Sequence, residues 1–557
     1  MSIIAIKYGQ VDPEAKADAK FKAVDQQDWA DINDLGLDDI NVRKVATLEH
    51  NYTLLDGSFE EFPNNPEDFQ WAWWTKSSSD SYGVFEVPPM LEVEFTQNHK
   101  SKGLTFVTNA RSLKVTWFNL VGGILHSDVY EFDGDEDTVR EVVIREPIEN
   151  YGGVEIKILA TNNPYRYGRL HVLDYGIVYL IDDAEINTAN ILEEDDPISD
   201  TLSINTLNFQ WKTKEPVFNP VSGDPSDDML MKKQYLYVMR DEKFFGAFFL
   251  EGWKDPFNTG NTFNFKAIDA IGVLDKYKFM GGLYEDIPAI DVVQEIFDLV
   301  FPTRLVKFKW DEALNGKTIR GYIPICTCRE ALQFICFAIG AVADTSRRRY
   351  VWIYPRDTEI HFDNIPKEKL YVGGNIEPTP YYSGLNMKFY AFARNNDGVE
   401  AFKGILPIGT HQIEFSEPLW GLSITGGTII ESDVNYAIIS VVQQGEVFVK
   451  GYSHTQSEAI HPIREEIIAG EVESLAIFEN CTLMNADNVK EIAESVFVYL
   501  KQRLSIENDA RLEELEVGYV AKMETYGRPI IGTIERMEIN LRGGRAKTRI
   551  IGNIGGD

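Results

Sequence analysis

Cysteine is scarce in this sequence, and its placement argues against both disulfides and zinc. The 557 residues include 4 cysteines, too few for a disulfide framework, so we expect the chain to fold in a reducing cytoplasm. Cys326 and Cys328 are separated by one residue, which is closer than the ligand spacing of a zinc knuckle. We therefore interpret these two, together with Cys336 and Cys481, as residues of the hydrophobic core.

Long hydrophobic runs are also missing. A membrane helix needs roughly 18 or more consecutive apolar residues, and the most apolar stretch, from Ala331 to Val342, is interrupted by Gln333 and Gly340. The N-terminal segment MSIIAIKYGQ has no basic region followed by a long apolar run, so it does not resemble a signal peptide. The sequence predicts no membrane insertion, and release from the cell by lysis instead of secretion.

Basic residues are outnumbered by acidic ones. The chain has 54 Lys and Arg against 87 Asp and Glu, which gives a formal net charge of -33. Such a surface repels nucleic acid and anionic lipid, so we expect no specific nucleic-acid binding. Solubility alone explains this balance, and so does a wall past which nucleic acid slides without sticking. The sequence leaves both interpretations open.

Known catalytic motifs are absent as well. The sequence contains no HExxH, GxSxG, Walker or Rossmann motif. Its 8 histidines are scattered, without the spacing of metal ligands. The sequence therefore predicts a protein that is not an enzyme, with no catalytic, metal-binding or cofactor-binding residue. A cell-wall-degrading enzyme stays an alternative, because a glycosidase needs only two well-placed carboxylates.

Asp133, Asp135 and Asp137 alternate in a turn, as the first ligands of a calcium loop do. An EF-hand also requires glycine at the sixth position and glutamate at the twelfth. Those positions are Thr138 and Ile144, which excludes an EF-hand. The remaining interpretations are a looser calcium site and, favoured over it, a solvated acidic turn.

Trp71 and Trp74 are candidate carbohydrate contacts, because exposed tryptophans stack on sugar rings. They cluster with Trp73 after a stretch rich in proline and asparagine. Alternation along a strand would instead bury Trp71 and Trp73 on one face of a β-sandwich, and we favour this interpretation. Carbohydrate binding by the N-terminal part of the chain stays an alternative function.

Residues 347–349 form an unbroken run of three arginines between a predicted helix and a predicted strand. A solvated turn is the favoured interpretation. Pairing with acidic neighbours is the alternative.

Short alternating runs indicate that strands make up most of the chain. Residues 91–95, 113–117 and 154–158 alternate at period two, and glycine-rich turns such as 122–123 and 152–153 separate such runs. Helical spacing occurs in three places: from Ile287 to Val300, from Cys328 to Gly340, and after Asn485, a candidate N-cap. The pattern predicts a mainly β, multidomain fold with a small α/β insertion.

The predicted domains follow from these patterns and from an acidic break at residues 187–200. They are an N-terminal arm with one short helix (1–45), a β-sandwich (46–185), a first β-barrel (186–286), a small α/β domain (287–355), a β-rich domain (356–470), and a C-terminal helix with closing strands (471–557), among them 515–517, 529–534 and 536–541.

Several short sequence segments, taken together, resemble those of a known family. They are FNFKAIDAIGVLD at 263–275, MGGLY at 280–284, GYIPICTCREAL at 321–332, ADTS at 343–346, and GTIERM at 532–537 followed by GGRA at 543–546. In this order, from about residue 185 to the end, they resemble the baseplate hub proteins of contractile-tailed phages, the tail-tip proteins of siphophages, and proteins of phage-tail-like bacteriocins. The N-terminal sandwich resembles the discoidin-like or carbohydrate-binding-like modules of some Firmicutes phage proteins, through Trp73-Trp74, Pro88-Pro89 and Asn163-Pro164-Tyr165-Arg166.

The resemblance implies a structural role. Hub proteins of this kind have two related β-barrels with inserted α/β domains, so residues 471–557 would hold the second barrel. Three chains would form a pseudo-sixfold ring that joins a sixfold tail tube to a threefold spike. The implied partners are two further copies, the tail tube protein, the tape measure, and the spike and baseplate wedge proteins. The implied location is the distal tail or baseplate of a virion or tail-like particle.

Overall fold

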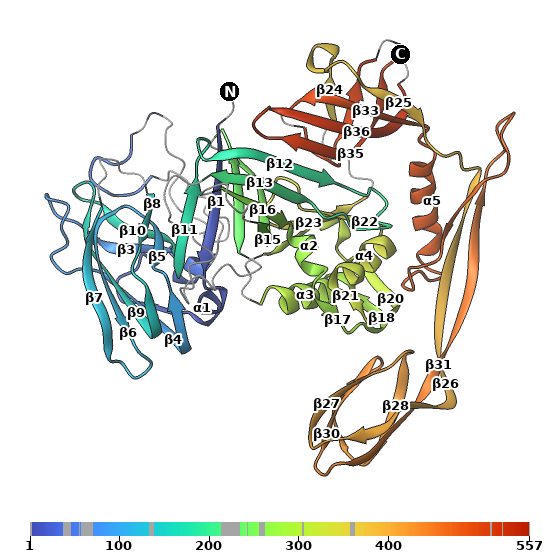
Figure 1. Cartoon of the computed structure of the whole chain (residues 1–557), viewed down its shortest axis with the longest axis horizontal. Helices are drawn as coiled ribbons and strands as arrows, with labels where there is room; N and C mark the ends of the chain where they lie inside the picture. The colour runs from blue at the N-terminus through green and yellow to red at the C-terminus, as the bar shows by residue number, and fades with distance from the viewer. Residues whose placement is uncertain are drawn as a thin grey trace.

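The fold is built from β-sheets with few helices, as predicted. The computed structural model describes residues 3–36, 46–54, 56, 71–132, 139–212, 234–241, 243–254, 262–302, 306–356, 362–512, 515–525 and 527–555. In Figure 1 an N-terminal body of strands lies beside a large central sheet, helices lie below that sheet, and a long two-stranded ribbon projects away from it. The predicted mainly β, multidomain fold class is confirmed.

The N-terminal body is a sandwich of two sheets. One sheet has the order β2 (Lys20–Ala23), β4 (Met90–Ser101), β9 (Ile148–Thr161), β6 (Ala110–Phe118) and β7 (Ile124–Glu131). The other has the order β3 (Trp73–Ser78), β10 (Tyr167–Asp174), β5 (Leu104–Thr108) and β8 (Arg140–Ile144). Side chains from both sheets, among them Trp73, Phe106 and Trp117, form one buried core. The alternating runs 91–95, 113–117 and 154–158 lie in β4, β6 and β9, as predicted.

One predicted turn in the sandwich is wrong. Gly152 and Gly153 lie inside β9 and do not end a strand. Gly153 is paired with Glu94 on β4 and with Phe118 on β6. Pairing on both sides holds the glycines in an extended conformation that the local sequence does not favour.

A 13-stranded sheet dominates the centre of the molecule. Its main path is β11 (Gly176–Ile181), β1 (Ile4–Val11), β14 (Tyr235–Arg240), β15 (Lys243–Lys254), β16 (Thr262–Ile268), β13 (Thr206–Lys212), β12 (Ile186–Glu194), β35 (Ile530–Asn540), β36 (Arg545–Ile554), β33 (Leu504–Arg511) and β25 (Asn375–Pro378). Off this path, β34 (Val520–Met523) pairs with β35 and with β24 (Phe362–Ile365). We call the strands from β11 to β12 the first half and those from β35 to β25, with β34 and β24, the second half.

The N-terminal segment differs from the predicted polar arm. Ile4–Val11 forms strand β1, which pairs with β11 on one side and β14 on the other. Ile4, Ile6 and Tyr8 alternate along it and are fully buried. The short helix expected in the arm is present as α1 (Pro13–Asp18), capped by the Asp12 side chain.

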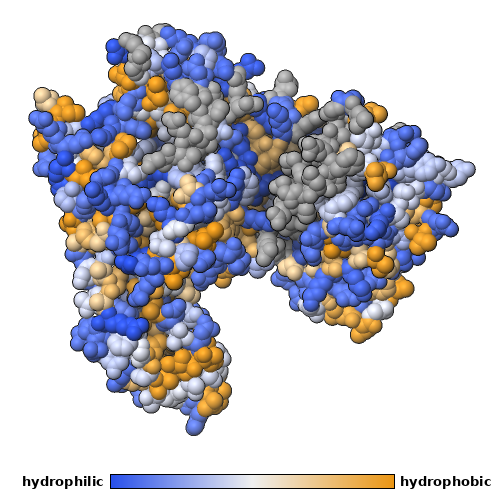
Figure 2. All heavy atoms as spheres, turned by 180° about the vertical axis from the view of Figure 1, so that it is seen from behind, coloured by the Kyte–Doolittle hydropathy of each residue, from blue (hydrophilic) through white to orange (hydrophobic). Residues whose placement is uncertain are grey.

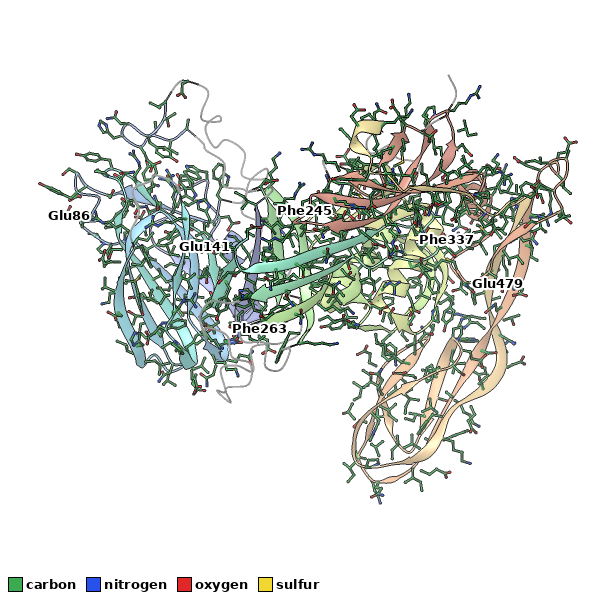
Figure 3. All side chains as sticks on the ribbon, turned by 45° about the horizontal axis from the view of Figure 1, so that its top comes forward. Glu86, Glu141, Phe245, Phe263, Phe337 and Glu479 are labelled. Atoms are coloured by element: carbon green, nitrogen blue, oxygen red, sulfur yellow. The ribbon has the colours of Figure 1, made fainter. Side chains whose placement is uncertain are left out.

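The sandwich adjoins the first half of the large sheet. The Thr105 hydroxyl on β5 donates a hydrogen bond to the Gly176 carbonyl (3.0 Å) and accepts one from the Val178 amide (3.1 Å), both on β11. Lys7 on β1 forms an ion pair with Glu141 on β8 at 2.6 Å (Figure 3). The outer side of β11 is therefore covered by the sandwich.

A small α/β unit packs against the large sheet. It comprises α2 (Ala270–Leu274), α3 (Ala289–Val300) and α4 (Cys328–Ile339), the hairpins β17 (Lys278–Phe279) with β21 (Cys326–Thr327) and β18 (Gly282–Pro288) with β20 (Thr318–Ile323), and the sheet β19 (Phe308–Trp310), β23 (Val351–Pro355), β22 (Ala341–Asp344). The predicted helices within 287–300 and 328–340 are confirmed. Helix α4 begins with a capping box between Thr327 and Glu330 and ends at Gly340 in the left-handed conformation, as expected.

The last helix, α5 (Val489–Leu500), starts later than Asn485 and packs with the α/β unit. Asn485 forms a turn in front of the helix, where its side chain accepts from the amides of Asp487 (2.9 Å) and Asn488 (3.3 Å). Its role is thus to shape the entry to the helix, and Asn488 occupies the N-cap position.

A ribbon and a terminal lobe project from the body (Figure 1). The ribbon pairs β26 (Gly384–Leu406) with β31 (Gly445–Arg464), flanked by β28 (Leu419–Thr425) and β32 (Leu475–Phe478). The lobe adds β27 (Gly409–Glu414), β30 (Tyr436–Val441) and β29 (Thr428–Asp433). Short 3-10 helices occur at η1 (Ile32–Gly36), η4 (Glu312–Leu314) and η5 (Lys367–Lys369). The predicted borders of the six domains stay predictions.

Candidate functional site: the charged junction in the large sheet

The two halves of the large sheet meet at one pair of strands. β12 and β35 are antiparallel, with Asn190 opposite Asn540 and Glu194 opposite Arg536. Ile191 on β12 and Ile539 on β35 are buried in the same hydrophobic core. Because hydrogen bonds and a core both cross this boundary, the halves form one continuous unit.

Arg347 reaches this boundary from the turn between β22 and β23. Its guanidinium donates to both carboxylate oxygens of Glu193 on β12, at 2.6 and 3.0 Å. It also lies 3.7 Å from the ring centroid of Phe245 on β15 (Figure 3). The side chains of Arg347 and Glu193 are 10% and 2% exposed. A two-pronged, charge-assisted contact shielded from water fixes the turn on the sheet.

The side chains of the next two arginines also contact other parts of the fold. Arg348 pairs with Asp344 at 2.5 Å and with Glu516 at 3.4 Å. The Arg349 guanidinium lies over the rings of Tyr237 and Phe244 at 4.9 and 4.7 Å. The favoured interpretation of residues 347–349 as a solvated turn is therefore wrong: Arg347 and Arg348 pair with acidic neighbours, and Arg349 lies against aromatic rings.

The acidic break at 187–200 supplies carboxylates to this junction. The Asp195 amide donates to the Glu535 carbonyl at 2.8 Å, which links the end of β12 to β35. Burial raises the pKa of Asp195 well above its ordinary value, and neighbouring carboxylates add to the rise. Burial also raises the pKa of Glu535 to about 7, although Arg549 opposes this rise from 3.1 Å.

Asp269 connects the α/β unit to the same region. Its side chain accepts from the Gly272 amide (2.8 Å), the Asn205 amide (3.0 Å) and the Thr345 hydroxyl (2.6 Å). Burial raises its pKa to about 6, and the hydrogen bonds partly offset that rise. One carboxylate thus caps α2 and holds the chain on either side of it.

Sequence reasoning missed most of this junction. The run of arginines and the acidic break are visible in the sequence, but no local signal pairs Arg347 with Glu193 or joins Asp195 to Glu535, because these partners are far apart in the chain. The predicted strand at 515–517 is also wrong: these residues form a loop. The loop is nevertheless positioned by the junction, since the Leu515 carbonyl accepts from Arg347 at 3.4 Å.

The contacts of the junction hold separate parts of the chain together. Ion pairs of Arg347 with Glu193, of Arg348 with Glu516 and of Arg549 with Glu535 join strands and loops from three parts of the chain. Among the residues that the structure describes, no group of three or more His, Cys, Asp or Glu side chains could hold a metal ion. The candidate calcium residues Asp133, Asp135 and Asp137 lie outside the described residues.

The candidate carbohydrate contacts are buried. Trp71 and Trp74 are 4% and 3% exposed and pack with Trp29, whose ring centroid lies 5.2 and 4.7 Å from theirs. Arg169 covers Trp74 at 4.2 Å. Neither ring offers the free face that stacking on a sugar requires, so this structure does not support Trp71 and Trp74 as carbohydrate contacts.

The three tryptophans also divide differently from the prediction. Trp73 belongs to the sandwich core, whereas Trp71 and Trp74 form a separate cluster. Ala72 has a φ of 53°, in the left-handed region, which breaks the alternation on which the prediction depended.

The four cysteines are free, and three of them are buried. Burial raises the pKa of Cys326, Cys328, Cys336 and Cys481 to about 12 in each case, so little reactive thiolate is present near neutral pH. None of the helices in the described parts of the chain has the length and apolar character needed to cross a membrane.

Comparisons with known proteins give structural similarities alone. No protein-family model matches the chain, and no curated protein matches it. Similar solved structures include phage tail and baseplate proteins. A tail protein from Neisseria meningitidis is 8% identical, with 67% of this chain and 93% of that chain covered and a TM-score of 0.41.

Two further tail proteins have a comparable degree of structural similarity to this chain. The 43 kDa tail protein of prophage MuSo2 from Shewanella oneidensis is 8% identical, covers 68% of this chain and 96% of its own, and has a TM-score of 0.40. Prophage tail protein gp18 from Listeria monocytogenes is 8% identical, with 68% and 92% covered and a TM-score of 0.37. TM-scores of this size do not establish a shared fold, so the roles of these proteins are not transferred to this chain.

Proposed function

We propose that this chain is a structural, non-enzymatic hub subunit of a phage tail or tail-like particle. Three copies form a ring at the distal end of the tail and join the sixfold tail tube to the threefold spike. The other partners are the tape measure and the baseplate wedge proteins.

The observation that carries the proposal is the joining of two β-halves in one sheet through β12 and β35. A chain with two such halves presents two β-surfaces, so three chains present six. Closed symmetry of this kind adapts a sixfold partner to a threefold one without a separate adaptor. The proposal requires the halves to keep a fixed relative position.

The buried junction supports that requirement. Arg347 of the α/β unit bonds Glu193 on β12 and the Leu515 carbonyl in the loop before β34, and the Asp195 amide bonds the Glu535 carbonyl across the boundary. A buried, bidentate pair specifies one geometry more strictly than apolar contact does. A hub subunit that sets the symmetry of the tube and spike proteins assembled on it needs such a rigid unit.

The mass of the purified chain in solution tests the proposal. Three copies of 63.3 kDa give about 190 kDa by sedimentation or native mass spectrometry. A monomer at every concentration, or a twofold dimer, would contradict it. Cell-wall hydrolysis by the pure trimer would contradict the non-enzymatic part of the proposal alone.

A further inference from the structure

The lobe at the end of the β26–β31 ribbon has a core of its own. Its buried members come from β27, β28, β30 and β31 and from the loop after β27. They are Ile413, Phe415, Leu419, Ala437, Ile439, Val441, Val447 and Val449. The aliphatic residues left on the outside of the lobe are therefore not needed to complete its core.

Three turns meet at the far end of the lobe. Strand register places Leu406 opposite Gly445, Gly409 opposite Val441, and Thr428 opposite Ser440. The turns between β26 and β27, between β28 and β29, and between β30 and β31 thus lie side by side. We call residues 407–408, 426–427 and 442–444 the tip turns.

Exposed aliphatic side chains gather at this end. Ile405, Ile408 and Val442 are 73%, 69% and 83% exposed, and we call these three the tip patch. Hydrophobic residues form a visible patch on the projecting lobe in Figure 2. Single exposed aliphatics are ordinary, and a group of three at the end of an extended arm makes this end a candidate interaction surface.

The tip is also nearly free of charge. The tip turns hold no charged residue. The nearest charges, Lys403 and Glu446, lie 3.7 Å apart and offset each other. On a chain of net charge -33, a neutral end is where a second copy can approach with the least repulsion.

The tip chemistry fits a protein surface better than a lipid surface. Segments that enter a membrane interface carry tryptophan, tyrosine or basic residues beside their aliphatics, and the tip turns carry none. The aromatic pair Trp420 and Tyr452 is set back along the ribbon, where the Trp420 indole donates to the Asn395 carbonyl at 3.0 Å.

We propose that the tip patch binds the same lobe of a second copy of this chain. The inference rests on the proposed function in one respect, that several copies assemble. The 23 residues of β26 span up to about 70 Å at roughly 3.3 Å per residue. The opposite end of the lobe is held on the α/β unit, where the Asn435 side chain donates to the Met280 carbonyl at 2.7 Å, so the tip faces away from the body (Figure 1).

The size of the patch sets the strength of this contact. Three aliphatic side chains bury far less than the roughly 800 Å² per partner of a stable interface. Tip contacts therefore form only when the ring has already brought the lobes together at high effective concentration. They tie the free ends of the arms to one another and do not build the ring.

Disulfide trapping in the full-length chain tests this inference. Val442→Cys places a thiol in the tip patch, and Val87→Cys places one at a matched position on the sandwich, where Val87 is 78% exposed. The native cysteines interfere little, because burial raises each of their pKa values to about 12. Under mild oxidation, we expect Val442→Cys to form disulfide-linked chains at least about tenfold faster than Val87→Cys.

A companion variant and a mass measurement separate the outcomes. Adding Ile408→Asp to Val442→Cys is expected to abolish the rate advantage while the mass of the assembly is unchanged. Equal rates for both cysteines in a protein of trimeric mass would overturn the tip contact and leave the proposed function standing. Flotation of the wild type with neutral lipid vesicles, lost in Ile408→Asp, would overturn it in favour of lipid. A monomeric mass would overturn both proposals.

Discussion

At the scale of single residues, the junction of the large sheet depends on charges that are paired away from water. Arg347 and Glu193 are the clearest case, since each satisfies the other in a place that water reaches poorly. Removing one partner leaves the other charge buried without compensation, which costs more than the pair itself contributes.

Arg347→Ala is expected to destabilise the large sheet by about 3–5 kcal/mol, because the Glu193 carboxylate would stay buried without its partner. Scanning calorimetry would show this as a lower midpoint for the transition of the large sheet. Arg528→Ala is the control, since Arg528 is exposed, and it should change the midpoint little. Equal shifts for the two variants would contradict the role assigned to Arg347.

Because of Glu535, we expect the large sheet to become more stable on mild acidification. Its pKa is about 7 in the folded chain, against an ordinary value of 4.5. The folded state therefore binds a proton that the unfolded state does not, and stability increases as pH falls from about 8 toward 5. The expected gain is about 2 kcal/mol in the free energy of unfolding of the large sheet.

Urea unfolding at pH 8, 6.5 and 5 measures this dependence. Glu535→Gln, which is neutral at every pH, should flatten the profile and raise the stability at pH 8. Asp269, with a pKa raised to about 6, contributes with the same sign and would leave a smaller slope. An unchanged profile in Glu535→Gln would show that this carboxyl is not the source.

Because of His171, we expect the stability of the sandwich to depend on pH in the opposite direction. Neither ring nitrogen has a hydrogen-bond partner within the described parts of the chain, and burial, followed by the charge of Arg169, lowers its pKa to about 3. Below pH 6.5 the His171 imidazole binds a proton in the unfolded state but not in the folded state. The sandwich therefore loses stability as pH falls through that value. His171→Phe should remove this loss, as judged by tryptophan fluorescence during urea unfolding at pH 7 and 5.

At the scale of elements, helix ends are set by local geometry that can be tested by matched substitutions. Gly340 ends α4 with a φ of 72°, and a Cβ there would lie 3.1 Å from Ile492 Cδ1 on α5. Gly316 has a φ of 81°, and nothing lies within 4 Å of its Cβ position. The two glycines therefore share the backbone constraint and differ in packing.

Gly340→Ala and Gly316→Ala should each cost about 1 kcal/mol for the left-handed conformation. Gly340→Ala should cost roughly 1 kcal/mol more, because its methyl group crowds α5. The difference between their thermal midpoints reports the contact between α4 and α5. A larger loss at Gly316 would contradict this packing.

The elements themselves could be predicted from the sequence where their signals are local. The helices at 289–300 and 328–339 follow from apolar residues at helical spacing, with a capping box and a terminal glycine for the second. Many strands follow from alternation. Ile4–Val11 has the same alternation, but it begins a mostly polar segment of 45 residues that predicts an arm, and its partners, β11 and β14, are distant in the chain.

The candidate site could not be predicted, because its contacts are non-local. Arg347 and Glu193 are 154 residues apart. The residues next to each of them in the sequence do not distinguish it from a charged residue that is exposed to solvent. The two halves of the sheet also meet only once β12 finds β35. Alternation gives each strand a buried face but no information on which strand lies beside it. The tryptophan pattern predicted that Trp71 and Trp73 are buried but placed them on one face, because it did not foresee the left-handed Ala72 that breaks the alternation.

At the scale of the whole molecule, three features bear on assembly. One sheet joins two halves, the sandwich covers the outer side of β11, and the ribbon ends in a lobe whose tip is nearly free of charge (Figure 1). A strongly acidic chain with such an extended arm gains little from the arm as a monomer. The proposed assembly into a ring would use both the rigid junction and the projecting arm.

Electron cryomicroscopy of particles purified from cells that produce this chain tests the central claim most directly. The account predicts three copies in a ring at the distal end of the tail, between tube and spike. In that ring, the two halves of each sheet would face the tube as six β-surfaces. Particles that are complete but contain no density for this chain would contradict it.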